Sequence, residues 1–156
     1  MKSPQITSLA AVLALVAAQD CLAEGVGKGC QFSSLPGINF GFYDPSDSSD
    51  LTTTTTITIK CKGNVDETIT ASTGANSADY NDRFLRGGDM DDTLRYQLFV
   101  DRARTTVWGD GTGNSSAIVV RQNGAFSSTT IYARMPARQD GSYGQYSDTI
   151  TVTVFP

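Results

Sequence analysis

The 156-residue sequence contains no histidine. This absence excludes Ser-His-Asp and Cys-His catalytic sites and histidine-liganded zinc, and it removes the most common general base at neutral pH. Cysteine is scarce as well: the chain has three, too few to form a zinc site without histidine. We therefore expect a protein that is not an enzyme, with no catalytic residue, no metal site and no cofactor.

Basic clusters and long apolar runs are also missing from most of the chain. The formal net charge is −4, with 12 Lys and Arg against 16 Asp and Glu and no basic run. Nucleic acid and anionic membranes are bound through clustered Lys and Arg, so neither is an expected partner. The one long apolar stretch, residues 6–18, is too short to cross a membrane, and we predict no membrane span.

The first residues are typical of a secretory signal peptide. Lys2 provides a positive start, residues 6–18 are rich in Ala, Leu and Val, and residues 21–23 (CLA) place small side chains where signal peptidase reads them. We predict cleavage after Ala23, which divides the chain into a signal peptide, 1–23, and a single domain, 24–156. Cleavage after Ala18 is the alternative.

Two cysteines, Cys30 and Cys61, remain after the predicted cut. An even pair in an oxidising compartment favours a disulfide. Residues 51–61 alternate in polarity, and Cys61 shares a face with Ile57 and Ile59, which suits a buried bridge. Closing a loop of about 30 residues stabilises a fold by about 3–4 kcal/mol on the chain-entropy model.

The rest of the chain has the composition of an all-β protein. Thr, Val, Ile, Tyr and Phe dominate the ordered stretches, and Gly, Asn, Asp, Ser and Pro cluster between them. Several short strands separated by turns favour a β-sandwich. Period-2 alternation is clearest in 51–61, 94–101 and 149–154, with shorter candidates at 38–43, 67–71, 117–121 and 129–134. Residues 74–88 form the longest irregular stretch, and residues 108–111 and 122–124 are predicted turns.

Two acidic, glycine-containing segments, 89–92 (DMDD) and 110–114 (DGTGN), could resemble calcium loops or a pair of glycosidase carboxylates. Neither has the full ligand spacing of a calcium loop. Asp and Asn accept hydrogen bonds from their own backbone and Gly supplies positive φ, so we interpret both segments as solvated turns.

Motifs in a fixed order make the chain resemble the spore coat protein U domain family, which covers secreted coat proteins and pilin subunits of archaic chaperone–usher pili. The resemblance runs over nearly the whole predicted mature chain. Its motifs are Cys30, 40–45 (FGFYDP), 57–61 (ITIKC), 83–85 (RFL), 94–99 (LRYQLF) leading through Asp101 to 106–111 (TVWGDG), and 144–154 (GQYSDTITVTV).

The resemblance implies an immunoglobulin-like β-sandwich that lacks its last strand and is completed by a donated strand. A periplasmic chaperone would lend that strand, and a neighbouring subunit would later replace it. The sequence ends directly after the alternating strand 149–154, so nothing in it covers that strand's edge. We expect a strand-acceptor groove with Ile150, Val152 and Val154 on one wall and Ile38, Phe40 and Phe42 on the other. The alternative is a closed sandwich in which all six are ordinary core residues.

The segment before Cys30 departs from the pattern of a strand donor. Residues 24–29 (EGVGKG) contain three glycines and one apolar side chain, and glycine fills no pocket. The chain is therefore expected to accept a strand without donating one, as a tip or terminal subunit would.

The resulting hypothesis is a secreted structural subunit of a bacterial surface assembly, namely a chaperone–usher pilus (fimbrium) with a role in adhesion and biofilm. It would pass through the periplasm to the cell surface with a periplasmic chaperone, an outer-membrane usher and other pilin subunits as partners. The alternatives are a self-folding spore or cell-envelope coat protein and a surface adhesin or lectin.

Overall fold

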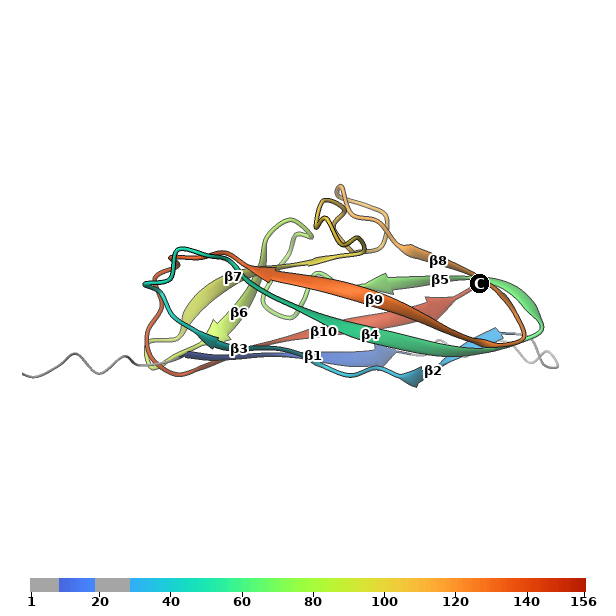
Figure 1. Cartoon of the computed structure of the whole chain (residues 1–156), viewed down its shortest axis with the longest axis horizontal. Coiled ribbons are helices and arrows are strands. Elements are labelled where there is room, and N and C mark those ends of the chain that lie inside the picture. The colour runs from blue at the N-terminus through green and yellow to red at the C-terminus, as the bar shows by residue number, and fades with distance from the viewer. Residues whose placement is uncertain (1–8, 19–28) are drawn as a thin grey trace, which may run out of the picture.

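The computed structural model describes residues 9–18 and 29–156, and within these ranges it consists of β-strands joined by turns and loops (Figure 1). No described segment forms a helix with the length and apolar character needed to cross a membrane. The all-β prediction is confirmed. The strands are β1 (Leu9–Ala18), β2 (Gly29–Ser34), β3 (Ile38–Tyr43), β4 (Leu51–Lys62), β5 (Asn64–Ala71), β6 (Arg83–Gly87), β7 (Asp92–Phe99), β8 (Ile118–Asn123), β9 (Phe126–Met135) and β10 (Gln145–Phe155).

The strands form two layers of a sandwich that are joined through β7. One layer has the order β2-β4-β9-β7, and the other has the order β6-β10-β1-β3, with β5 pairing the C-terminal half of β10 and β8 pairing β5. The first half of β7 pairs with β6 and its last three residues pair with β9, so this strand passes from one layer to the other. The predicted sandwich is thus built from one continuous, folded sheet (Figure 1).

Alternating side chains from both layers fill the core. In β10 every second residue from Tyr146 to Val154 is buried, and in β4 the buried positions include Ile57, Ile59 and Cys61. A strand with one face on a core and one on solvent needs this period of two. The largest fully buried side chains are Trp108, Arg83, Tyr96, Tyr146, Ile38, Ile57, Ile59, Ile69, Leu85, Leu94 and Leu98.

Two expectations from the sequence were wrong, and one strand was missed. The stretch 74–88 was expected to be irregular, but its last part forms β6, where Arg83 and Leu85 are both buried. The strand β2 was not predicted, because GCQFSS does not alternate in polarity. Trp108 was placed in a turn, but its side chain is fully buried and its indole N–H donates to the carbonyl of Ile69 over 3.4 Å.

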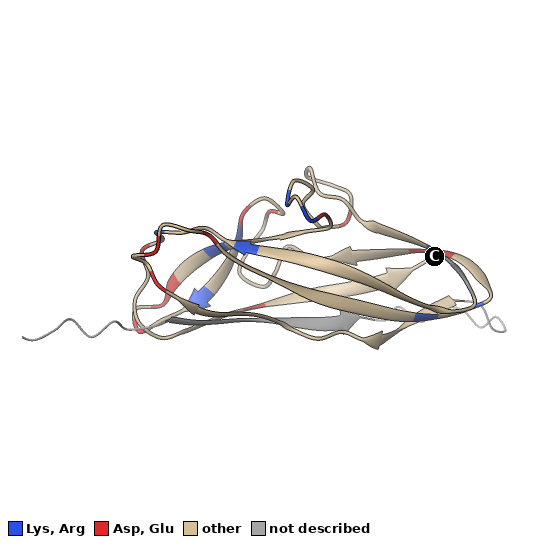
Figure 2. Cartoon of the chain, in the orientation of Figure 1, with Lys and Arg blue, Asp and Glu red and all other residues tan. Residues whose placement is uncertain are grey.

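Charged residues lie mainly on the loops and on the short strands β6 and β7, while the long strands carry few (Figure 2). The predicted signal cleavage after Ala23 or Ala18, the cysteine Cys21 and the glycine-rich residues 24–28 fall wholly or partly outside the described residues.

Candidate strand-acceptor site

The two edges of β10 have different partners. On one edge, β10 pairs antiparallel with β6 at Tyr146 and Ser147, and with β5 from Val152 to Phe155. On the other edge it pairs with β1 alone, in parallel, through nine residue pairs that run from Ala10–Gln145 to Ala18–Thr153. The second edge of β10 is therefore covered by a segment that the sequence predicts to be part of a signal peptide.

β1 also provides the only strand partner of β3 among the described residues. The two strands pair antiparallel from Leu9–Tyr43 to Leu13–Ile38. Backbone N–H and C=O groups that lose a strand partner must bond to water or to another chain, and a long unpaired edge is a template for strand addition. Without residues 9–18, a slot would open between β3 and β10, and both of its edges would be unpaired. We call this space the β3–β10 slot.

The structure places five of the six predicted groove residues in the core beside this slot. Ile150 and Val152 on β10 are fully buried, and Val154 is 6% exposed. On β3, Ile38 and Phe40 are 1% and 5% exposed. The two predicted walls are thus the two strands that flank β1, and their inward side chains belong to one hydrophobic cluster.

Phe42 differs from the prediction. Its side chain is 74% exposed, while the next residue, Tyr43, is buried. The register of β3 against β1 shifts by one residue between Asn39 and Gly41, and Gly41 has a φ of 79°. Such a glycine bulge inserts one extra residue and reverses which side chains face inward, so Phe42 points to solvent and Tyr43 takes the inward position.

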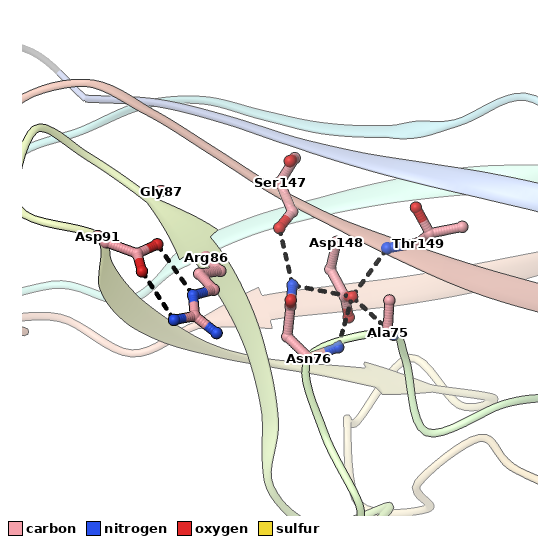
Figure 3. Close-up of a pocket in the computed structure, with 8 residues that line it drawn as sticks. All are labelled: Ala75, Asn76, Arg86, Gly87, Asp91, Ser147, Asp148 and Thr149. Carbon is pink, nitrogen blue, oxygen red and sulfur yellow. Dashed lines mark hydrogen bonds and ion pairs between the residues drawn. The ribbon is translucent and has the colours of Figure 1, made fainter.

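The first half of β10 is held by the buried carboxylate of Asp148. Its Oδ1 accepts hydrogen bonds from the backbone N–H groups of Ala75, Asn76 and Thr149 at 2.8–3.2 Å, and from Nδ2 of Asn76 at 3.1 Å (Figure 3). Asn76 Nδ2 also donates to the carbonyl of Ser147. These bonds fasten the 75–76 loop to β10.

A second buried side chain, Tyr96 on β7, completes this anchor. Its hydroxyl donates to Oδ2 of Asp148 over 2.6 Å. Burial, followed by the hydrogen bond to Asp148, raises the pKa of Tyr96 well above its usual range, so the phenol stays protonated and remains a donor. The carboxylate of Asp148 therefore has donors on both oxygens.

Arg83 on β6 is the buried cation of the same region. Its Nη2 donates to the carbonyls of Ser72 and Trp108 at 2.7 and 2.8 Å, Nε donates to the carbonyl of Thr73, and Nη1 donates to Oε1 of Gln97. Burial lowers the pKa of Arg83, and the nearby Tyr96 and Asp148 oppose that shift. The guanidinium ties two loops, at Ser72–Thr73 and at Trp108, to the sheet.

A shallow pocket lies beside this network, between β6, the start of β10 and the 75–76 loop (Figure 3). Its charged groups are already paired: Arg86 donates to both carboxylate oxygens of Asp91 at 2.9 and 2.7 Å, and Asp148 has the donors described above. The arrangement fastens strands and offers no activated nucleophile or general base. Within the described residues, no group of three or more Cys, Asp or Glu side chains is placed to hold a metal ion.

The predicted disulfide is present. Cys30 on β2 and Cys61 on β4 are paired residues of neighbouring strands and form the bridge. Of the acidic segments, Asp110 accepts both the backbone N–H and the hydroxyl of Thr112, at 2.8 and 2.7 Å, as in an Asx turn. These bonds lower the pKa of Asp110, because they favour the carboxylate.

Comparison with known proteins agrees with this architecture. The Spore Coat Protein U domain matches residues 14–153. The chain belongs to this family. Within it, Protein U of Myxococcus xanthus is 28% identical, over 83% of this chain and 78% of that protein. The resemblance predicted from the sequence motifs is thereby confirmed.

A solved structure supports the fold of this spore coat protein U domain. It is the pre-assembly complex of the chaperone CsuC with the tip adhesion subunit CsuE, from archaic chaperone–usher Csu pili of Acinetobacter baumannii. The TM-score is 0.59 at 18% identity, and the match covers 83% of this chain. It covers 40% of the matched chain, so this protein spans less than half of that chain's length.

Sequence reasoning named inward residues of β3 and β10, the two strands beside β1, but missed the residues that anchor β10. Arg83 was noted only as part of a family motif, although it lies two residues before the buried Leu85, on the same face of β6. An arginine at an inward position of an alternating strand is a usable signal, because a buried cation needs several acceptors. Asp148 gave a similar signal, because this charged residue lies between Tyr146 and Ile150 at an inward position of β10.

Proposed function

We propose that this protein is a non-enzymatic structural subunit of a bacterial surface assembly, and that its processed form, 24–156, accepts a β-strand into the β3–β10 slot. One observation carries the proposal. The only described strand that covers β3 and the outer edge of β10 is the segment that the sequence predicts to be removed by signal peptidase.

The physical argument is strand addition. An incoming strand satisfies the backbone groups of two edges at once, and its alternating side chains complete the core beside Ile150, Val152 and Phe40. Each fully buried aliphatic or aromatic side chain contributes about 1.5–3 kcal/mol. An empty slot would expose several such side chains to water and so remove a large part of the domain's stability. A domain with this slot empty needs a partner strand to fold.

The partners proposed on this basis are a periplasmic chaperone, an outer-membrane usher and other pilin subunits, met on the way through the periplasm to the cell surface. The similar solved structure is a complex of a chaperone with a pilus subunit, which supports a chaperone as the first strand donor. The usher follows from the same pathway. A tip or terminal position, with a role in adhesion, rests on the glycine-rich composition of residues 24–29.

A second candidate function is supported by the relative Protein U of Myxococcus xanthus, whose identity to this chain is higher than that of the pilus subunit. In this case the protein is a spore or cell-envelope coat protein. Its processed chain would then fold without a donated strand, and β3 and β10 would close on each other or remain hydrated.

Site-specific photo-crosslinking in the native host distinguishes these candidates. A photoreactive residue replaces Asn39, which is exposed on β3 and pairs with Val12 of β1. The matched control replaces Lys60, which is exposed on β4 and pairs with Gln31 of β2 on one side and Phe126 of β9 on the other. We expect position 39 to cross-link the processed protein to a strand of another polypeptide, identified by mass spectrometry, and position 60 to give no such product.

A chaperone peptide at position 39 in periplasmic material, followed by a subunit peptide in surface material, is the result expected for a pilus subunit. Uncross-linked protein at both positions, in periplasmic and surface fractions alike, would contradict strand acceptance and favour the self-folding coat protein.

A further inference from the structure

We propose that residues 9–18 act as an intramolecular stand-in for the donated strand, so that removal of the signal segment is the step that creates the acceptor slot. This inference rests on the proposed function and adds a control mechanism to it. The uncut chain is a closed sandwich, and the processed chain is an acceptor.

The backbone pairing of β1 supports this role. It forms nine pairs with β10 and five with β3, and it lies inside the sheet, not at its margin. A segment with both edges paired is a full member of a sheet. Its sequence, LAAVLALVAA, contains no polar or charged residue.

The connection to β2 is long enough to allow this placement. Ala18 pairs with Thr153, near the C-terminal end of β10. Gly29, the first residue of β2, lies at the same end, because a Cβ built on it would be 3.9 Å from Oε1 of Glu67, and the neighbouring Thr68 pairs with Phe155. The ten residues between them can span roughly 30 Å, since an extended chain covers about 3.3 Å per residue.

The tether gives the stand-in a kinetic advantage over any separate strand. A segment tied to its binding site by a link of about ten residues is present at an effective concentration on the order of millimolar. While the link is intact, a donor strand from a partner protein must compete with residues 9–18 at this high effective concentration. Cutting the link releases β1 to dilution and leaves the β3–β10 slot for a partner.

Amide exchange of the full chain tests the placement of β1 directly. The uncut protein, residues 1–156, is produced by cell-free synthesis under oxidising conditions and without membranes, so that no signal peptidase is present. In this chain β3 has no described strand partner other than β1, so exchange at residues 38–42 reports on pairing with β1, except at Gly41, whose N–H donates to Oδ1 of Asn39. Strand β9, paired with β4 and β7, serves as the internal control.

The test variant is Ala14→Pro, in the middle of β1, and the matched control is Gln5→Pro, outside β1. Proline removes a ladder N–H and is tolerated poorly between two strands. We expect protection of β3 in the wild type and in Gln5→Pro, and a loss of about tenfold or more in Ala14→Pro. Equal protection of β3 in all three chains would overturn the inference.

A peptide of residues 9–18 with two added lysines at each end, supplied in trans, separates failure of the inference from failure of the proposed function. If the uncut wild type leaves β3 unprotected and the peptide restores protection, the inference fails and strand acceptance stands. If β3 is protected in Ala14→Pro and the peptide changes nothing, both fail. Protection lost in Ala14→Pro and restored by the peptide supports both.

Cross-linking provides an independent check of the register. In a Cys21→Ser background, the pair Ala14→Cys and Thr149→Cys joins two residues that the structure places opposite each other. The control pair, Ala14→Cys with Thr153→Cys, is displaced by four residues, or about 13 Å along a strand. We expect a disulfide in the first pair only. Equal cross-linking of both pairs, or of neither, would contradict the proposed register.

Discussion

The first two strands of the chain, β1 and β2, are neighbours in sequence but are held in different ways. β2 pairs with β4 and is joined to it covalently by the Cys30–Cys61 bridge. β1 is held by backbone pairing to β10 and β3, with no covalent link across the sheet. The covalent bridge lies on the strand that the sequence predicts to remain, and not on the strand that it predicts to leave.

This difference indicates that the sandwich has a permanent part and a replaceable part. The permanent part is fastened by the disulfide at one end and by the buried Arg83–Tyr96–Asp148 network at the other. The replaceable part is the strand position of β1. Once it is empty, the neighbouring strands β3 and β10 present apolar side chains and unpaired backbone groups to an incoming strand. The contacts of Asp148 keep β10, one edge of the slot, in place for an incoming strand.

Removal of the bridge is expected to have the largest effect on the permanent part. Cys61→Ser in the uncut chain should lower the free energy of unfolding by about 3–4 kcal/mol, because the loop between Cys30 and Cys61 is no longer closed in the unfolded state. Chemical denaturation measures the loss. Amide exchange should show β2 loosened while β3 stays protected by β1. Loss of protection at β3 but not at β2 would contradict the division into two parts.

Loss of the buried cation should have the next largest effect. Arg83→Ala leaves the carbonyls of Ser72 and Trp108 without donors and opens a cavity, at a cost of about 2–4 kcal/mol. The matched control is Arg86→Ala on the same strand, whose exposed ion pair with Asp91 should contribute between about 0 and 1 kcal/mol. Thermal or denaturant unfolding compares them. Equal losses for the two variants would refute the anchoring role of Arg83.

A smaller effect is expected from the hydroxyl of Tyr96. Tyr96→Phe removes the donor to Asp148 while keeping the ring, and a hydrogen bond to a charged partner contributes about 1.5–3 kcal/mol. Exchange at the N-terminal half of β10 should increase more than exchange at its C-terminal half, which pairs with β5. An unchanged unfolding free energy would mean that water replaces the phenol at no cost.

The smallest expected effect is a pH dependence at Glu67, beside the start of β2. The side chain is 3% exposed, and burial raises its pKa above the ordinary 4.5. A raised folded pKa means that protonated Glu67 stabilises the fold below about pH 4.5 and that this contribution is lost as pH rises through the folded pKa. Glu67→Gln should flatten the profile of unfolding free energy in this window. Identical profiles for variant and wild type would contradict it.

Much of the fold could be predicted because the strands alternate in polarity. Residues 51–61 and 149–154 follow a strict period of two, and both became long strands with buried inward side chains. β2 and β6 were missed for physical reasons. The sequence of β2, GCQFSS, does not alternate in polarity. The sequence of β6, RFLRG, alternates only if its arginine Arg83 is counted as an inward, buried residue. Their positions depend on the disulfide and on hydrogen bonds to distant loops.

The walls of the slot followed from the same alternation, together with the family resemblance. The outward turn of Phe42 could not be predicted, because it depends on a bulge at Gly41 that only the pairing with β1 defines. The occupant of the slot was missed as well. Residues 6–18 have the composition of a signal peptide, and composition alone does not say that such a segment can also complete a sheet.

The most direct test of strand acceptance is refolding of the oxidised processed chain, 24–156, with and without the lysine-flanked peptide of residues 9–18. Near-ultraviolet circular dichroism reports on tertiary packing, and a hydrophobic dye reports on exposed apolar surface. The account predicts a dye-binding, weakly packed chain that becomes cooperative when the peptide is added. A chain that folds cooperatively alone and does not respond to the peptide would contradict it.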